Sequence, residues 1–234
     1  MYQRVLRRMF ASFLRGRNEK SLFLSRNQVN ISLDLQDNRT DDNKKMPEKR
    51  EAVLHFPYPL DRTLVLVGMP GCGKSSIGRR LARIYSLPFV DADVEIEKAG
   101  GGDVCYLFER YGEAAFRQAE QRIMARLLDA ETCILASGGG AFLSEMTREN
   151  VKNKAVGLFL DASIETIARN TAGRTHRPLL NVADPRAVIE KMAAVRRPFY
   201  EQADLRVAFG DETMGRLLRR IVSKINDFAA KGKK

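Results

Sequence analysis

From Thr63 onward, short apolar runs alternate with stretches of helical periodicity. Runs of four or five residues predict strands, and stretches with apolar residues every three to four positions predict helices. The predicted strands are Thr63–Val67, Pro88–Asp91, Thr132–Ala136, Ala155–Leu160 and Leu205–Ala208. The predicted helices are Lys74–Tyr85, Val104–Tyr111, Glu113–Leu128, Ser144–Asn153, Ser163–Asn170, Pro185–Arg196 and Thr213–Phe228. Strands joined by helical crossovers favour an α/β fold, with one five-stranded parallel sheet and helices on both faces.

The first sixty residues differ from the rest, so we divide the chain into an extension, residues 1–60, and a folded domain, residues 61–230. Residues 1–18 contain five arginines among apolar residues and no acidic residue, a basic amphipathic pattern that resembles an organellar targeting segment. The alternatives are a disordered tail or a start assigned too early, with Met46 as the true start. We expect a cytoplasmic protein, or one in a plastid or another organelle if residues 1–45 are a targeting segment.

Composition narrows the class of protein further. The 234 residues, 44% of them hydrophobic, can bury a full core, and no apolar run reaches the roughly 18 residues of a membrane span. The net charge is +11, and residues 1–45 hold ten Lys and Arg against five Asp and Glu. The remaining positive charge includes arginines that suit phosphates and a carboxylate, so we predict no nucleic-acid partner and no membrane partner. Cys72, Cys105 and Cys133 have no metal-binding spacing, which favours reduced thiols.

A phosphate-binding loop follows the first predicted strand. Residues 68–75, GMPGCGKS, fit the pattern G-x-x-x-x-G-K-S/T, and an amphipathic helix comes next. Lys74 suits the β- and γ-phosphates of a nucleoside triphosphate and Ser75 suits Mg²⁺, whereas the alternative is a glycine-rich turn that binds nothing. The thiol of Cys72 lies near a helix N-terminus, where it could become acidic and oxidisable, or it simply fills a tolerant position.

Two further motifs stand at predicted strand ends. Asp91 and Asp93 can point into one cleft, one carboxylate toward the Mg²⁺ and the other toward the phosphoryl acceptor; in the alternative, Asp93 is a helix N-cap. The third strand ends in Gly138-Gly139-Gly140 without an Asp or Glu for the metal, which favours Asp91 as the metal-side carboxylate. These glycines bare backbone N–H groups to a small anionic or hydroxylated molecule, or they form a tight turn without a ligand.

The last candidates are arginines. Arg117 and Glu120 share a helix face, which taken alone indicates a surface ion pair. The loop from Arg174 to Leu180 is basic and contains a proline, which is typical of a mobile lid over phosphates, and we assign its His176 no special chemistry. Arg196 stands at the end of the next predicted helix and supplies another guanidinium.

In series, the phosphate loop, D-x-D, F-R-x-x-E, G-G-G, R-P-L-L and R-x-P-L/F-Y resemble shikimate kinase from about Thr63 to about Ala208. The resemblance implies a nucleoside-monophosphate-kinase-like fold and transfer of the ATP γ-phosphoryl group to the 3-hydroxyl of shikimate, in the route to chorismate and aromatic amino acids. It also implies Mg²⁺ as cofactor, with shikimate and ATP as small-molecule substrates. We expect a monomer.

The resemblance also implies roles for single residues. It implies catalytic roles for Lys74, Asp93 as the base, and Arg177 as the lid arginine. It implies an ATP site of Gly71, Cys72, Gly73, Lys74, Ser75, Ser76 and Arg177, with Arg169 as the match on the adenine side. It implies shikimate binding by Asp93, Arg117, Gly139, Gly140 and Arg196, and Mg²⁺ binding by Ser75 and Asp91.

The chain departs from the family pattern in few places. Phe199 stands where leucine is commoner, which changes packing more than chemistry, and the basic N-terminal extension lies outside the pattern. A related small-molecule kinase such as a gluconate kinase is one alternative, but it has no obvious need for two carboxylate-binding arginines. A sensor that binds nucleotide or shikimate without turnover is another, and the intact set of Lys74, Asp91, Asp93 and Arg177 argues against it.

Overall fold

A five-stranded sheet forms the centre of the computed structural model, which describes residues 59–172 and 184–231. The strands are β1 (Thr63–Val67), β2 (Phe89–Asp91), β3 (Ile134–Ala136), β4 (Ala155–Ala162) and β5 (Leu205–Phe209). Their order is β2-β3-β1-β4-β5, and every pair is parallel. The predicted α/β fold with five parallel strands is confirmed.

Burial explains why these segments are strands. All residues of β1, β3 and β4 are buried, as expected for inner strands covered on both faces. Val65 of β1 pairs with Leu135 on one side and with Gly157 on the other, so β1 lies in the middle of the sheet. The edge strand β5 alternates instead: Leu205 and Val207 are buried, whereas Arg206 and Ala208 are exposed.

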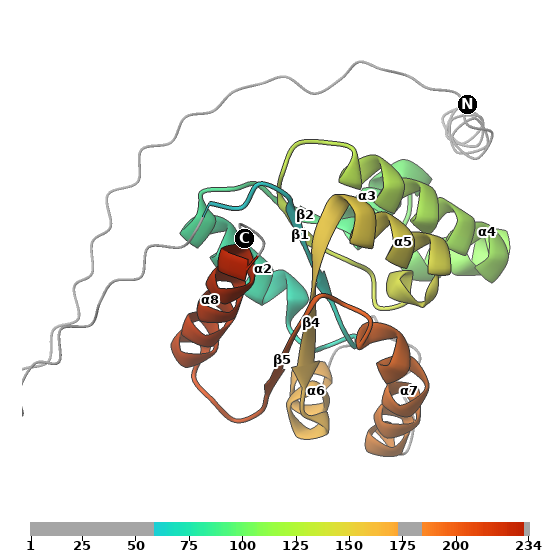
Figure 1. The fold of residues 1–234 in the computed structure, drawn as a ribbon. Helices are drawn as coiled ribbons and strands as arrows, with labels where there is room; N and C mark the ends of the chain where they lie inside the picture. Colours follow the sequence, from blue (N-terminus) through green and yellow to red (C-terminus); the bar gives the residue numbers. More distant parts are fainter. Residues whose placement is uncertain (1–58, 173–183, 232–234) are drawn as a thin grey trace, which may run out of the picture.

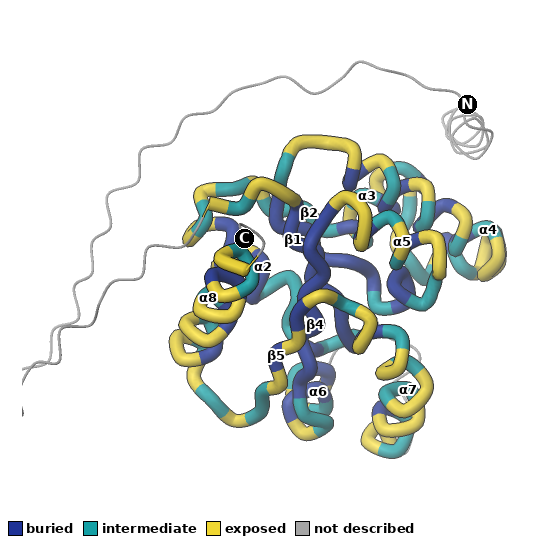
Figure 2. Tube along the Cα trace, viewed as in Figure 1, coloured by how far each residue is buried: buried dark blue, intermediate teal, exposed yellow. Residues whose placement is uncertain are grey.

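Helices cover both faces of the sheet. They are α2 (Lys74–Tyr85), α3 (Ala92–Gly100), α4 (Val104–Leu128), α5 (Glu145–Lys154), α6 (Ile164–Thr171), α7 (Pro185–Tyr200) and α8 (Met214–Lys231), with a 3₁₀ turn η1 (Ala141–Leu143) after β3. In Figure 1, α2 and α8 lie on one side of the sheet, and α4 and α5 lie on the other. Figure 2 shows the buried trace concentrated in the strands and the exposed trace on the outer sides of the helices.

Two helices, α3 and α7, differ from the expectation, and α4 confirms a predicted break. Helix α3 was not predicted; its buried residues Ala92, Ile96 and Gly100 recur every four positions on one face. Within α4, Gly112 has φ 78° and ψ 164°, so the predicted break between two helices is confirmed. Helix α7 continues four residues past its predicted end, because Pro198 lies in its last turn, where a missing N–H costs one bond and does not end the helix at once.

Two groups of expectations lie outside the described residues. They concern the N-terminal extension up to residue 58, Met46 included, and the basic loop with His176 and Arg177. Within the residues that are described, no helix is both long and apolar enough to span a membrane.

The parallel order brings the predicted motifs to one edge. The phosphate loop follows β1, Asp91 ends β2, and the glycine turn follows β3. The carboxyl ends of parallel strands lie at the same edge of a sheet, so these three segments are neighbours.

Candidate active site

The loop between β1 and α2 has the backbone geometry of an anion site. Gly71 and Gly73 have φ angles of 87° and 95°, which residues with a Cβ rarely adopt. Gly73 is also the N-cap of α2 and makes no side-chain cap bond. The helix therefore begins at the loop with its positive dipole end toward any bound anion. Lys74 Nζ donates to the carbonyl oxygens of Gly68 at 2.8 Å and Met69 at 3.1 Å, so its ammonium lies against the same loop.

A hydroxyl and a carboxylate meet beside this loop. Ser75 Oγ donates to Asp91 Oδ2 at 2.7 Å, and Asp91 Oδ1 accepts the backbone N–H of Asp93 at 3.2 Å. Asp91 is therefore the N-cap of α3, and the alternative that Asp93 caps the helix is wrong.

The oxygen pair of Ser75 and Asp91 fits Mg²⁺, which prefers hard oxygen ligands and commonly takes only one or two from the protein. Among residues 59–172 and 184–231, no group of three or more His, Cys, Asp and Glu side chains could hold a metal alone. A metal here would take its remaining ligands from phosphate and water.

The glycine turn after β3 is the point where the other segments meet. A Cβ on Gly138 would lie 2.6 Å from Asp93 Oδ1 and 2.7 Å from Glu120 Oε1, and one on Gly139 would lie 2.7 Å from Pro70 Cγ. A Cβ on Gly140 would overlap the guanidinium of Arg117. None of the three has a positive φ, so what requires glycine is space for neighbouring side chains.

Arg117 approaches this turn from α4 and is held from several directions. Its Nη1 donates to Glu120 Oε2 at 2.8 Å, and its Nε lies 3.4 Å from Glu113 Oε1. Its guanidinium carbon lies 5.4 Å from the ring centroids of both Phe108 and Phe116. These contacts aim the guanidinium at the turn.

Glu120 is buried, so the interpretation of the pair as a surface contact is wrong. Its side chain is 3% exposed. Burial raises the pKa of Glu120 above its usual value and the charge of Asp93 raises it further, while Arg117 acts in the opposite direction.

Arg196 and Tyr200 reach the same turn from α7. Arg196 Nη1 donates to the carbonyl oxygen of Gly139 at 3.2 Å, and the Tyr200 hydroxyl donates to that oxygen at 2.5 Å. Burial raises the pKa of Tyr200 to about 12, so the phenol keeps its proton at neutral pH. The sequence interpretation missed Tyr200, although it stands four residues after Arg196 and continuation of the helix would have placed both on one face.

The remaining residues named in the sequence analysis make separate contacts of their own. The Phe199 ring lies 5.1 Å under the Arg148 guanidinium carbon, a cation–π contact that leucine could not make. The Ser76 hydroxyl accepts a hydrogen bond from Arg80, and the Cys72 side chain is buried. Lid residue Arg177 lies outside the described residues.

On the adenine side, the structure draws attention to a residue that was not predicted. Arg169 is exposed and pairs with Asp211 at 3.5 Å. Its neighbour Asn170 instead donates through Nδ2 to the carbonyl oxygen of Gly71 at 2.9 Å. No motif in the sequence identified this contact, which joins residues 99 positions apart.

The site can thus hold phosphates on one side and an anion between two guanidinium groups on the other. The structure brings together Lys74, Ser75, Asp91, Asp93, Arg117, Gly139, Gly140 and Arg196 around the glycine turn.

Comparison with known proteins identifies the family. The sequence model of the shikimate kinase family matches residues 70–226. A shikimate kinase of Rhodopseudomonas palustris is 43% identical over 168 residues, which cover 72% of this chain and 83% of the relative. One from Paramagnetospirillum magneticum is 46% identical over 153 residues, covering 65% and 78%. The solved structure of a shikimate kinase from Acinetobacter baumannii in complex with shikimate superposes with a TM-score of 0.66 at 31% identity, covering 69% of this chain and 91% of that one. The chain therefore belongs to the shikimate kinase family, the enzymes that transfer the γ-phosphoryl group of ATP to shikimate.

Proposed function

We propose that the described site carries out this transfer to the 3-hydroxyl of shikimate in two halves that meet at the glycine turn. The observation that carries the proposal is the turn itself: Pro70 of the phosphate loop packs on Gly139, while Arg117 and Arg196 contact Gly140 and Gly139. Phosphate-binding backbone and carboxylate-binding guanidinium groups are thus within one turn of each other. This arrangement suits a reaction between a nucleoside triphosphate and a small carboxylic acid.

In the nucleotide half, the loop N–H groups and the Lys74 ammonium bind the phosphates. Lys74 exchanges its contacts with the carbonyls of Gly68 and Met69 for phosphate oxygens. Ser75 and Asp91 would hold Mg²⁺ beside these phosphates. When bound, Mg²⁺ neutralises charge on the β- and γ-phosphates.

In the acceptor half, Arg117, which lies against Gly140, and Arg196, which contacts Gly139, bind the shikimate carboxylate. A planar carboxylate is held best by guanidinium groups, which form two parallel hydrogen bonds. Glu120 keeps Arg117 in place by accepting its hydrogen bond, and Tyr200 keeps the Gly139 carbonyl in place beside Arg196. Backbone groups of Gly139 and Gly140 contact the substrate.

Asp93 accepts the proton of the reacting hydroxyl. It stands one residue beyond the first position of α3, and its Oδ1 lies against Gly138, between the phosphate loop and the acceptor half. Phosphoryl transfer needs positioning and charge stabilisation more than covalent chemistry, so the geometry of this carboxylate matters as much as its basicity. Arg177 completes the proposal as the lid residue that contacts the transferring phosphoryl group.

The test is ADP release by the purified full-length protein. With Mg²⁺ and ATP, we expect turnover with shikimate and only background release with gluconate or without an acceptor. Chelation of Mg²⁺ with EDTA should abolish the signal, and added Mg²⁺ should restore it. Turnover that is equal with gluconate, or ATP binding without acceptor-dependent turnover, would refute the proposal.

The division of the chain is a proposal as well. If residues 1–60 are an extension that contributes nothing to the site, deletion of residues 1–45 leaves kcat and both KM values within about twofold. A truncated protein that is folded but inactive would refute this division. We further propose a monomer that acts on small molecules alone, which light scattering of the active protein tests.

A further inference from the structure

The buried ring of Tyr200, which packs on Phe159, and a set of polar contacts hold the last turn of α7 to the rest of the protein. Only Ile189 and Tyr200 of its sixteen residues are buried, and Figure 2 shows much of its trace as exposed. Pro198 lies in the last turn and cannot donate a backbone hydrogen bond. Contacts outside the helix therefore set the direction in which this turn presents Arg196.

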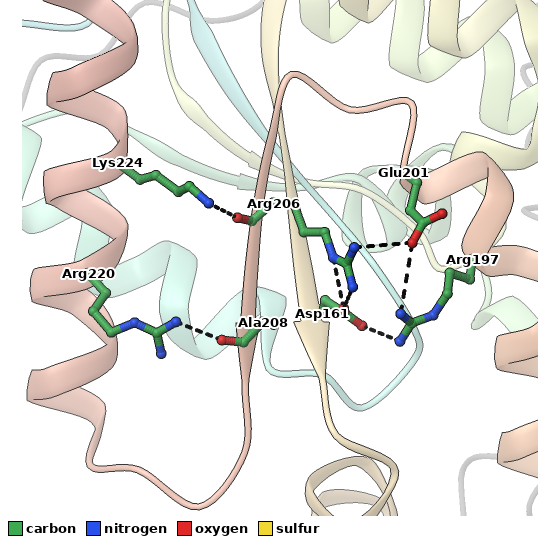
Figure 3. Close-up of polar contacts among 7 residues, drawn as sticks. All are labelled: Asp161, Arg197, Glu201, Arg206, Ala208, Arg220 and Lys224. Carbon is green, nitrogen blue, oxygen red and sulfur yellow. Dashed lines mark hydrogen bonds and ion pairs between the residues drawn. The ribbon is translucent and has the colours of Figure 1, made fainter.

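Asp161 of β4 provides the strongest of these contacts. Its side chain is 8% exposed, and Oδ1 accepts a hydrogen bond from Arg197 Nη2 at 2.8 Å. Its Oδ2 accepts from Arg206 Nε at 3.0 Å and Nη2 at 2.7 Å (Figure 3). A carboxylate so far removed from water requires such partners, and with both oxygens engaged its orientation is fixed.

The strand pair β4 and β5, to which Asp161 belongs, is itself held in place by α8. On the outer edge of β5, Lys224 and Arg220 of α8 donate to the carbonyl oxygens of Arg206 and Ala208 at 2.7 and 2.9 Å. Figure 3 shows this chain of contacts from α8 through β5 and β4 to α7. The strand pair is thus a firm support from which the Asp161 carboxylate reaches α7.

Glu201 forms an outer part of the same network. It lies 3.3 Å from Arg206 and 3.9 Å from Arg197, and all three side chains are more than 40% exposed. Exposed ion pairs of this kind contribute little, so the buried carboxylate of Asp161 is the effective anchor.

The anchored turn also carries the substrate-facing groups. Arg196 and Tyr200, on either side of Arg197 in the sequence, donate to the Gly139 carbonyl. Because Arg197 lies in the same helical turn as Arg196 and Tyr200, a displacement of Arg197 also displaces these two residues. Displacement of about 1 Å at a positioned group is enough to weaken a reaction strongly.

We propose that Asp161 is a positioning residue for the acceptor: through Arg197 it fixes the last turn of α7, and thereby the Arg196 guanidinium and the Gly139 turn. This inference rests on the proposed binding of the substrate carboxylate by Arg196.

The test compares two ways of removing one partner of Asp161. Arg197→Gln breaks the contact to α7, and we expect the KM for shikimate to rise about 10-fold, as loss of one charge-assisted hydrogen bond would produce. The KM for ATP should stay within twofold. Asp161→Asn should raise the KM for shikimate to the same extent.

Two further variants serve as comparisons. Arg206→Ala frees Oδ2 of Asp161 but leaves the contact to Arg197; it should lower Tm and raise the KM for shikimate clearly less than Arg197→Gln does. Glu201→Gln should change neither quantity.

Arg196→Ala, measured in parallel, separates this inference from the proposed function. If Arg196→Ala raises the KM for shikimate and Arg197→Gln does not, the positioning role is wrong and the proposed function stands. If Arg196→Ala has no effect, the assignment of Arg196 fails and the inference falls with it. An equal rise in KM with Arg206→Ala would show a general loss of structure and overturn the positioning role. If Asp161→Asn does not fold, Arg197→Gln decides alone, because that side chain is 45% exposed.

Discussion

The two halves of the site are built in different ways. The nucleotide half is mostly one stretch of eight residues, whose function depends on backbone conformation at Gly71 and Gly73. The acceptor half is assembled from α4, the glycine turn and α7, and its hydrogen bonds to Gly139 come from residues 57 and 61 positions away. The phosphate loop is one contiguous motif, so it can be recognised from the sequence alone. The acceptor half is assembled from distant segments, and its contacts depend on partners that no local sequence pattern indicates.

This difference predicts how each half fails. A substitution in the nucleotide half removes a direct phosphate contact. A substitution in the acceptor half removes one hydrogen bond from a network around the two arginines, so the loss of shikimate binding should depend on how many hydrogen bonds remain.

The largest effect is expected for Lys74→Ala, in the contiguous half. Removal of the ammonium takes away a preorganised charge at the phosphates, so turnover should fall by at least about 10³-fold. ADP release under saturating shikimate measures it, with the exposed Lys98→Ala as the control. Substantial residual turnover in Lys74→Ala would contradict the assignment of the loop.

The next effect is expected for Asp93→Asn, at the border of the two halves. Loss of a general base should lower kcat by at least about 100-fold, with the KM for ATP largely unchanged. Asp91→Asn, its partner in the D-x-D, should instead raise the Mg²⁺ concentration required for half-maximal rate, because Asp91 contacts Ser75. If Asp93→Asn abolished ATP binding alone, the roles of the two carboxylates would be misassigned.

The same comparison explains how far the sequence could predict the fold. The buried runs of β1 and β4 and the break at Gly112 were predictable, because burial on both faces and a glycine with positive φ leave local signals. The short helix α3 was missed because it directly follows a three-residue strand, with Asp91 serving as strand end and N-cap at once. Helix α7 was ended too early because Pro198 indicates a break that, in a last turn, costs little.

In the site, the motif residues of both halves were predictable and their supports were not. The burial of Glu120 depends on how α4 packs against the glycine turn, a long-range event that the spacing to Arg117 cannot report. Asn170 and Asp161 likewise act on residues far away in the sequence. The glycines of the turn were predicted to bare N–H groups, which stays a prediction; the structure adds that a side chain at these positions would overlap Asp93, Pro70 or Arg117.

In the assembled half, Arg117→Lys tests the guanidinium geometry. Loss of a charge-assisted hydrogen bond of about 1.5–3 kcal/mol should raise the KM for shikimate roughly 10- to 150-fold, with the KM for ATP unchanged. Arg126→Lys, an exposed arginine on the same helix, is the matched control. An unchanged KM for shikimate would remove Arg117 from the site.

A pH experiment tests the buried support of Arg117. Burial raises the pKa of Glu120 in the folded state, so the folded protein binds its proton more tightly than the unfolded chain does. The free energy of unfolding should then fall as the pH rises above the usual value of 4.5, by at most about 1.4 kcal/mol per pH unit. Urea unfolding between pH 4.5 and 7.5 should show a shallower decline in Glu120→Gln than in the native protein. The exposed Glu113→Gln should keep the native slope, and identical slopes in all three proteins would contradict the prediction.

The smallest effect is expected for Asn170→Ala, in the nucleotide half. There a residue distant in the sequence, Asn170, supports the phosphate loop. Its amide donates to the carbonyl of Gly71, so it holds the loop from outside the motif. A neutral hydrogen bond contributes about 0.5–1.5 kcal/mol, and its loss should raise the KM for ATP about 2- to 12-fold with the KM for shikimate unchanged. Glu165→Gln, exposed on the same helix, is the control. If the KM for ATP did not change, the loop would hold its conformation through its own backbone alone, and the contrast between a self-contained nucleotide half and a supported acceptor half would be sharper than the contacts suggest.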